Sequence, residues 1–168
     1  MNLRAPLALT LLMLTSCASA TKAAPGDSEA PTAVERDVAS AGFDEALAAE
    51  LRADDYGMGQ YVIAFLRAGP NRDRSEEETA ELQRQHMANI QRLAAEGVLV
   101  LAGPFLDDGE LRGIYVFDVK DVEEARRLTE TDPAIQAGSL TLELHPWYGS
   151  AALRQVNAVH EAIAKVKM

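Results

Sequence analysis

Cysteine is almost absent from this chain, and positive charge is scarce. Cys17 is the single cysteine among 168 residues, which excludes an intramolecular disulfide and a metal site built from several thiolates. Lys and Arg number 16 against 26 Asp and Glu, giving a formal net charge of -10. Because an acidic surface repels phosphate backbones and anionic lipid headgroups, we expect no nucleic-acid partner.

Recognisable cofactor and metal motifs are also missing. The three histidines, His86, His145 and His160, do not have the spacing of metal ligands. The sequence contains no G-x-S-x-G nucleophile motif, no phosphate-binding P-loop and no dinucleotide-binding glycine pattern. We therefore expect neither a bound metal nor another cofactor.

The first residues have the features of an export signal. Arg4 supplies a short positive region, and residues 5–14 form an apolar stretch too short to span a bilayer. Residues 14–17, Leu-Thr-Ser-Cys, resemble the bacterial lipobox, which implies a signal peptide over residues 1–16 and lipidation of Cys17. The alternative is ordinary secretion, because Ala18-Ser19-Ala20 fits an A-x-A cleavage site.

Lipidation at Cys17 predicts a location at the cell envelope, with the lipid anchor as the membrane contact. Ala18 rather than Asp follows the cysteine, so we expect the periplasmic side of the outer membrane if the host is Gram-negative. Ordinary processing would instead leave the protein periplasmic or secreted. Residues 17–54 are expected to form a disordered tether, in which Phe43, Leu47 and Leu51 have the spacing of a short helix.

The remaining chain has the pattern of an α+β domain over residues 55–149, followed by an amphipathic helix within residues 150–168. The expected elements are a strand at 60–66, a helix at 75–96, strands at 98–102 and 111–118, a helix at 121–131, a helical turn at 133–138 and a strand at 141–145. Pro146 is expected to end the last strand. This β-α-β-β-α-β order is the ferredoxin-like arrangement, with both helices on one face of an antiparallel sheet.

The first three strands are apolar on both faces, although two helices can cover only one. A bare apolar face of that size predicts an interface, and we expect a homodimer whose sheets pack face to face. The C-terminal helix is the competing cover for the same face.

His86 occupies an unusual position on the apolar side of the 75–96 helix. It falls on one stripe with Leu82 and Ile90. Because an unpaired buried polar group costs roughly 1–3 kcal/mol, the imidazole needs a partner, and Asp132 is the best candidate. Asp132 also precedes Pro133 and is a good helix N-cap. A His–Asp pair is either a structural tie or an acid–base device.

Four sequence runs together resemble the YciI-like (YCII-related) family: His86–Ile90, Leu99–Phe105, Thr131–Gly138 and His145–Trp147. The resemblance covers roughly residues 61–148. It implies a dimeric α+β barrel and a cleft that holds a His–Asp pair, here His86 and Asp132. It also implies that Gly103 and Pro104 line the cleft. A minority of the family is linked to dehydrochlorination of hydroxylated aromatic compounds.

Two functions follow from these expectations. The first is a small cofactor-free enzyme for isomerisation or elimination, with His86 as general base and Asp132 orienting it. His145 and Trp147, at the end of the last strand, are expected near the mouth of the cleft, where they would contact substrate. The second is a non-catalytic envelope module that binds a small ligand or a protein.

Overall fold

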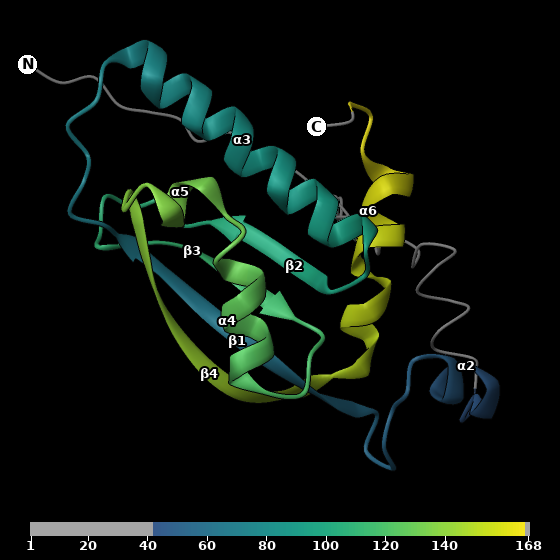
Figure 1. Ribbon diagram of the computed structural model, residues 1–168. Helices are drawn as coiled ribbons and strands as arrows, with labels where there is room; N and C mark the ends of the chain where they lie inside the picture. The colour runs from purple at the N-terminus through teal and green to yellow at the C-terminus, as the bar shows by residue number, and fades with distance from the viewer. Residues whose placement is uncertain (1–41, 167–168) are drawn as a thin grey trace, which may run out of the picture. The chain divides into compact units, whose positions relative to one another are not determined.

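The computed structural model describes residues 42–166, which form an α+β domain (Figure 1). In chain order its elements are α2 (Glu45–Glu50), β1 (Met58–Ala68), α3 (Glu76–Ala95), β2 (Leu99–Pro104), β3 (Leu111–Phe117), α4 (Val122–Thr129), α5 (Pro133–Gln136), β4 (Leu140–Ser150), the 3-10 helix η1 (Ala151–Gln155) and α6 (Val156–Ile163). No helix in this range is long and apolar enough to cross a membrane. The signal peptide, Cys17 and most of the tether lie outside the described residues.

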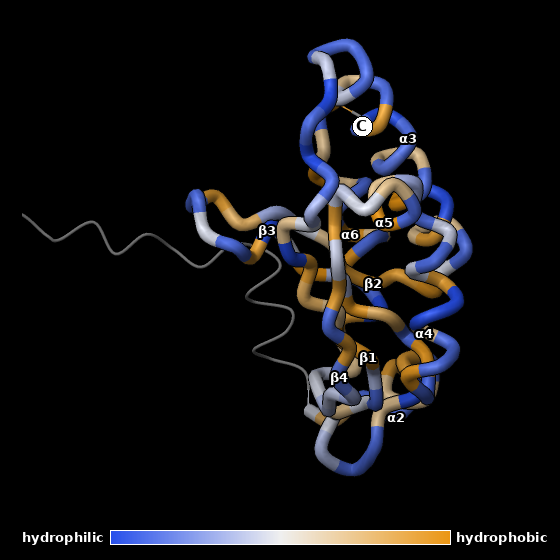
Figure 2. Tube along the Cα trace, turned by 60° about the vertical axis from the view of Figure 1, so that its left-hand side comes forward, coloured by the Kyte–Doolittle hydropathy of each residue, from blue (hydrophilic) through white to orange (hydrophobic). Residues whose placement is uncertain are grey.

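The four strands form one antiparallel sheet in the order β2-β3-β1-β4. Ala64 of β1 lies opposite Tyr115 of β3 on one side and Leu144 of β4 on the other. Helices α3 and α4 lie to one side of the strands, which is clear when the sheet is turned towards its edge (Figure 2). The ferredoxin-like order expected from the sequence is therefore confirmed.

Helix α3 begins at a capping box and positions the candidate site. Ser75 Oγ accepts a hydrogen bond from the Glu78 amide at 3.2 Å, and the Glu78 carboxylate accepts one from the Ser75 amide at 2.9 Å. The second bond holds the pKa of the Glu78 carboxyl below its ordinary value. Gly97 follows the helix with a φ of 74°, a conformation that glycine adopts without strain.

The main core lies between the sheet and these helices. Its fully buried side chains come from alternate strand positions and from the inner side of α3: Val62, Ala64, Leu66, Leu93, Leu99, Tyr115 and Phe117. This period of two places even-numbered β1 residues towards the helices. The same alternation decides which strand residues can reach a site beneath α3.

Strand β4 is longer than expected. It continues through Pro146, which lies opposite Val62, and ends only at Ser150. The expectation that Pro146 ends the strand is wrong because β4 is an edge strand, where a proline can face its missing N–H away from the sheet.

The C-terminal segment also differs from the expected single helix. It starts as the 3-10 helix η1 and becomes α-helical only in α6. Leu153 of η1 packs on Tyr61, Val100 and Val116, which belong to the face of the sheet opposite the main core. The C-terminal segment therefore covers part of the second sheet face.

An arginine fixes this segment in place. Arg154 donates two hydrogen bonds to Asp118, at 2.9 and 2.8 Å, and a third to the Leu51 carbonyl at 2.7 Å. Its guanidinium lies 4.9 Å from the centre of the Tyr61 ring. Because Leu51 directly follows α2, Arg154 joins both ends of the described chain to the sheet. Helix α2 confirms the short helix expected near residues 43–51.

Candidate functional site

A cavity of about 530 Å³ lies between α3 and the sheet, a volume that suits a small organic molecule. We call it the His86 cavity. Its lining residues are Leu66, Arg72, Thr79, Leu82, Gln83, His86, Met87, Ile90, Ala102, Gly103, Pro104, Arg112, Gly113, Tyr115, Ala134, Ser139 and Leu140.

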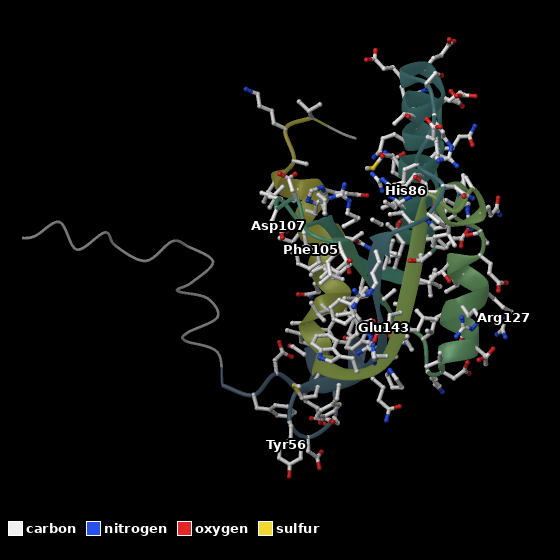
Figure 3. All side chains as sticks on the ribbon, turned by 90° about the vertical axis from the view of Figure 1, so that its left-hand side faces the viewer. Tyr56, His86, Phe105, Asp107, Arg127 and Glu143 are labelled. Atoms are coloured by element: carbon white, nitrogen blue, oxygen red, sulfur yellow. The ribbon has the colours of Figure 1, made fainter. Side chains whose placement is uncertain are left out.

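His86, which is labelled in Figure 3, lies in the middle of α3 and lines this cavity. Its side chain is 13% exposed, and Nδ1 lies 2.9 Å from each carboxylate oxygen of Asp132. Among the described residues, Nε2 has no hydrogen-bond partner. The Asp132 carboxylate therefore holds Nδ1 of His86, whereas Nε2 is left unpaired, and the His86 side chain borders the cavity.

Asp132 is fully buried and holds three groups at once. It is the N-cap of α5, and its Oδ1 accepts a hydrogen bond from the Ala134 amide at 2.9 Å. Its Oδ2 accepts one from the Tyr115 hydroxyl at 2.8 Å, and both oxygens face His86. The capping role and the contact with His86 therefore coexist on one carboxylate.

Tyr115 is the member of this cluster that the sequence reasoning missed. It lies on β3, is 2% exposed, and its ring centre is 6.3 Å from that of His86. Burial raises the pKa of its hydroxyl well above the ordinary value, and the neighbouring charge of Asp132 raises it further. Tyr115 thus remains a protonated donor that fixes the Asp132 carboxylate. Tyr115 shares the core side of β3 with Phe117, but β3 is apolar on both faces, so the sequence alone did not identify that side.

Gly103 and Pro104 both line the His86 cavity, at the end of β2. Gly113 on β3 lies opposite Pro104, and a Cβ on Gly113 would come within 2.7 Å of the Gly103 carbonyl oxygen. The two strands therefore approach closely at this wall of the cavity.

His145 and Trp147 do not line the cavity, so their expected position at its mouth needs correction. Leu142 and Leu144 pack against the main core, and alternation along β4 turns His145 and Trp147 to the opposite face. There, His145 Nε2 lies 3.0 Å from the Glu143 carboxylate, and this contact lowers the pKa of Glu143. The Trp147 ring lies 5.9 Å from that of Tyr61.

A second cavity, of about 450 Å³, lies between α3, β2 and α6, and shares Ile90 and Ala102 with the first.

Within residues 42–166, no group of three or more His, Cys, Asp or Glu side chains is arranged to hold a metal ion. The side chains able to move a proton at the His86 cavity are those of His86 and its partners.

Comparison with known proteins identifies a domain family and similar individual proteins. The YCII-related domain matches residues 63–147. A Bacillus subtilis (strain 168) protein, "Uncharacterized protein YjpA", is 34% identical over 73 residues, which cover 41% of this chain and 84% of that protein.

One similar solved structure is 5-chloro-2-hydroxyhydroquinone dehydrochlorinase (TftG) from Burkholderia phenoliruptrix AC1100, in complex with 2,5-dihydroxybenzoquinone. It has a TM-score of 0.40 and 20% sequence identity, and the match covers 53% of this chain and 93% of that one.

Proposed function

Because the chain belongs to the YCII-related domain family, we propose that it is an enzyme that transfers protons on a small organic substrate in the His86 cavity. His86 is the general base, Asp132 orients it, and the reaction is an isomerisation or an elimination that uses no cofactor. One observation carries the proposal: Asp132 holds His86 Nδ1 at 2.9 Å, while Nε2 has no partner and the side chain borders a ligand-sized cavity.

The geometry assigns a role to each nitrogen of His86. A carboxylate only accepts hydrogen bonds, so Asp132 favours the form of His86 with the proton on Nδ1 and the lone pair on Nε2. Nε2 then removes a proton from a substrate carbon, and Asp132 stabilises the imidazolium that forms. Return of the proton to another carbon completes an isomerisation; departure of a leaving group completes an elimination.

Solvent-deuterium exchange tests this function directly. The full chain is incubated in D2O with a panel of small ketones, keto acids and hydroxylated aromatics, and deuterium uptake at carbon is followed by NMR. We expect wild-type protein to accelerate uptake for a subset of the panel. His86→Gln should lower that rate by about 100- to 10,000-fold, the usual contribution of general-base catalysis.

His145→Gln is the matched control, because His145 is exposed on the other face of the sheet and should leave the rate unchanged. An unchanged rate in His86→Gln would contradict the proposal. So would the absence of exchange by the wild-type protein across the panel, which would favour the ligand-binding module instead.

We further propose that the uncovered part of the second sheet face forms a homodimer interface. Trp147, which lies opposite Tyr61 on this face, is 39% exposed there, beyond the area that Leu153 covers. Sedimentation velocity should show a dimer, and Trp147→Asp should shift it towards monomer without unfolding it. Wild-type protein that remains monomeric at all accessible concentrations would contradict this proposal and make the C-terminal segment the sole cover.

Lipidation at Cys17 remains a proposal for the location, since this residue lies outside the described part of the chain. The lipobox-like residues 14–17 support it. The protein should fractionate with membranes in its native host, and Cys17→Ser should release or misprocess it. A mature N-terminus at Thr21, found by mass spectrometry, would instead show ordinary secretion.

A further inference from the structure

The lining of the His86 cavity has a charge opposite to that of the chain. The whole sequence has a net charge of -10, yet among residues 42–166 no Asp or Glu lines this cavity. Two arginines do: Arg72 from the segment between β1 and α3, and Arg112 at the start of β3. They come from separate segments, so the fold brings them to the same cavity.

Both arginines are free of carboxylate partners among residues 42–166, whereas most other arginines there are paired. The Arg72 side chain donates to the Ser139 carbonyl at 3.4 Å, and that of Arg112 to the Gly109 carbonyl at 3.2 Å. A guanidinium has five N–H donors, so most of its donors remain available in each case.

Arg67, an arginine of β1, does pair with carboxylates, so acidic partners are present in this part of the sheet. Arg67 contacts the carboxylates of Glu110 and Glu143, at 3.6 and 3.3 Å. Glu110 is close to Arg112 in sequence but pairs with Arg67 instead. Glu110 and Glu143 therefore pair with Arg67 rather than with the arginines that line the cavity.

We propose that the His86 cavity binds an organic carboxylate, with Arg72 and Arg112 contacting the carboxylate group. Guanidinium groups bind carboxylates through parallel hydrogen bonds, and the partial burial of Arg112 strengthens the interaction there, while Arg72 is exposed. The apolar side chains of Leu66, Ile90 and Leu140 line the remaining wall and suit an apolar body. This inference rests on the proposed function in one respect: the body of the bound molecule presents its reacting carbon to His86 Nε2.

The charge balance at the site favours an anion. Asp132 contributes one negative charge beneath His86, but it is fully buried and held by the Tyr115 hydroxyl and the Ala134 amide. The two guanidinium groups border the cavity itself. A carboxylate would therefore meet two cations in the cavity and one carboxylate screened behind His86.

Benzoate and benzamide provide the test, because they match in size and differ in charge. Each is titrated into the full chain, and backbone amide shifts of Gly103 and Gly113 report binding by NMR. We expect benzoate to bind at least about tenfold more tightly than benzamide. Arg72→Gln and Arg112→Gln should each weaken benzoate binding by about tenfold and leave benzamide unchanged.

Arg127→Gln is the matched control, since Arg127 on α4 also has no carboxylate within 4.0 Å in the described part of the chain and does not line the cavity. It should leave both affinities unchanged. Arg72→Lys and Arg112→Lys keep the charge and should retain part of the preference for benzoate, which guards against a loss that arises from misfolding.

Equal affinities for the two probes, including no measurable binding of either, would overturn the inference. Benzoate shifts that map away from Gly103 and Gly113 would overturn it as well. The proposed function fails separately. If His86→Gln keeps the exchange rate while the arginine variants lose their preference for benzoate, the anion site stands without the chemistry. If His86→Gln loses the exchange rate while the arginine variants keep their preference for benzoate, the anion site is ruled out and the proposed chemistry stands.

Discussion

In the Asp132→Asn variant, we expect the proton-exchange rate to fall by about 100- to 10,000-fold while the protein keeps its fold. The asparagine oxygen can still accept the hydrogen bond from the Ala134 amide, so α5 keeps its cap. The amide nitrogen, however, would face His86 Nδ1 as a donor. It would move the imidazole proton to Nε2, so the nitrogen that the proposed reaction uses as a base would carry a hydrogen instead.

Two measurements separate this effect from simple damage. Nitrogen-15 NMR of histidine-labelled protein should show His86 protonated on Nδ1 in the wild type and on Nε2 in the variant. Asp121→Asn is the matched control, because Asp121 caps α4 by accepting a hydrogen bond from the Glu124 amide at 2.8 Å, with no role proposed at the cavity. Asp121→Asn should keep the exchange rate of the wild type. Full exchange activity in Asp132→Asn would rule out the orienting role.

Asp118→Ala is expected to lower the free energy of unfolding by about 3 kcal/mol, as for other broken ion pairs with little exposure. The Asp118 side chain is only 7% exposed and pairs with both Arg154 and Arg52. Its hydrogen bond with Arg154 raises the pKa of that guanidinium. Because the Arg154 side chain is only 12% exposed, the variant would leave a positive charge partly buried without a counter-ion.

Chemical unfolding of Asp118→Ala, Arg154→Met and the double variant gives a thermodynamic cycle that isolates the coupling between the two side chains. The double variant should be more stable than Asp118→Ala alone, since it removes the uncompensated charge. Glu123→Ala is the control, because Glu123 forms an exposed pair with Arg126 at 3.9 Å and should change stability by less than about 1 kcal/mol. A similarly small effect in Asp118→Ala would show that Arg154 is not held by this contact.

Local sequence signals were sufficient to predict where most of the elements start. Ser75 with Glu78, and Asp121 with Glu124, are short-range pairs whose capping role needs no knowledge of the fold. The proximity of His86 and Asp132 required one further step, the rule that a polar group on an apolar helix face needs a partner. The structure places these two side chains in contact, and their catalytic role remains a prediction.

The errors came from features that depend on neighbouring strands. Strands that are apolar on both sides do not reveal which face meets the helices, so Tyr115 could not be assigned to the His86 side. For His145 the signal was present: alternation groups it with Thr141 and Glu143, apart from the leucines of β4. The position of His145 along the strand does not determine which face it occupies, whereas the alternation does.

Pro146 has a consequence for the behaviour of the protein at high concentration. Strand β4 is 11 residues long and forms one edge of the sheet, where free N–H and C=O groups could recruit a strand from another molecule. Since Pro146 stays paired with Val62 inside the ladder, its nitrogen must face that open edge, where it has no hydrogen to donate. The proline thus interrupts the row of donors that intermolecular β-aggregation would need, and the strand keeps its length without becoming a continuous template for fibril growth.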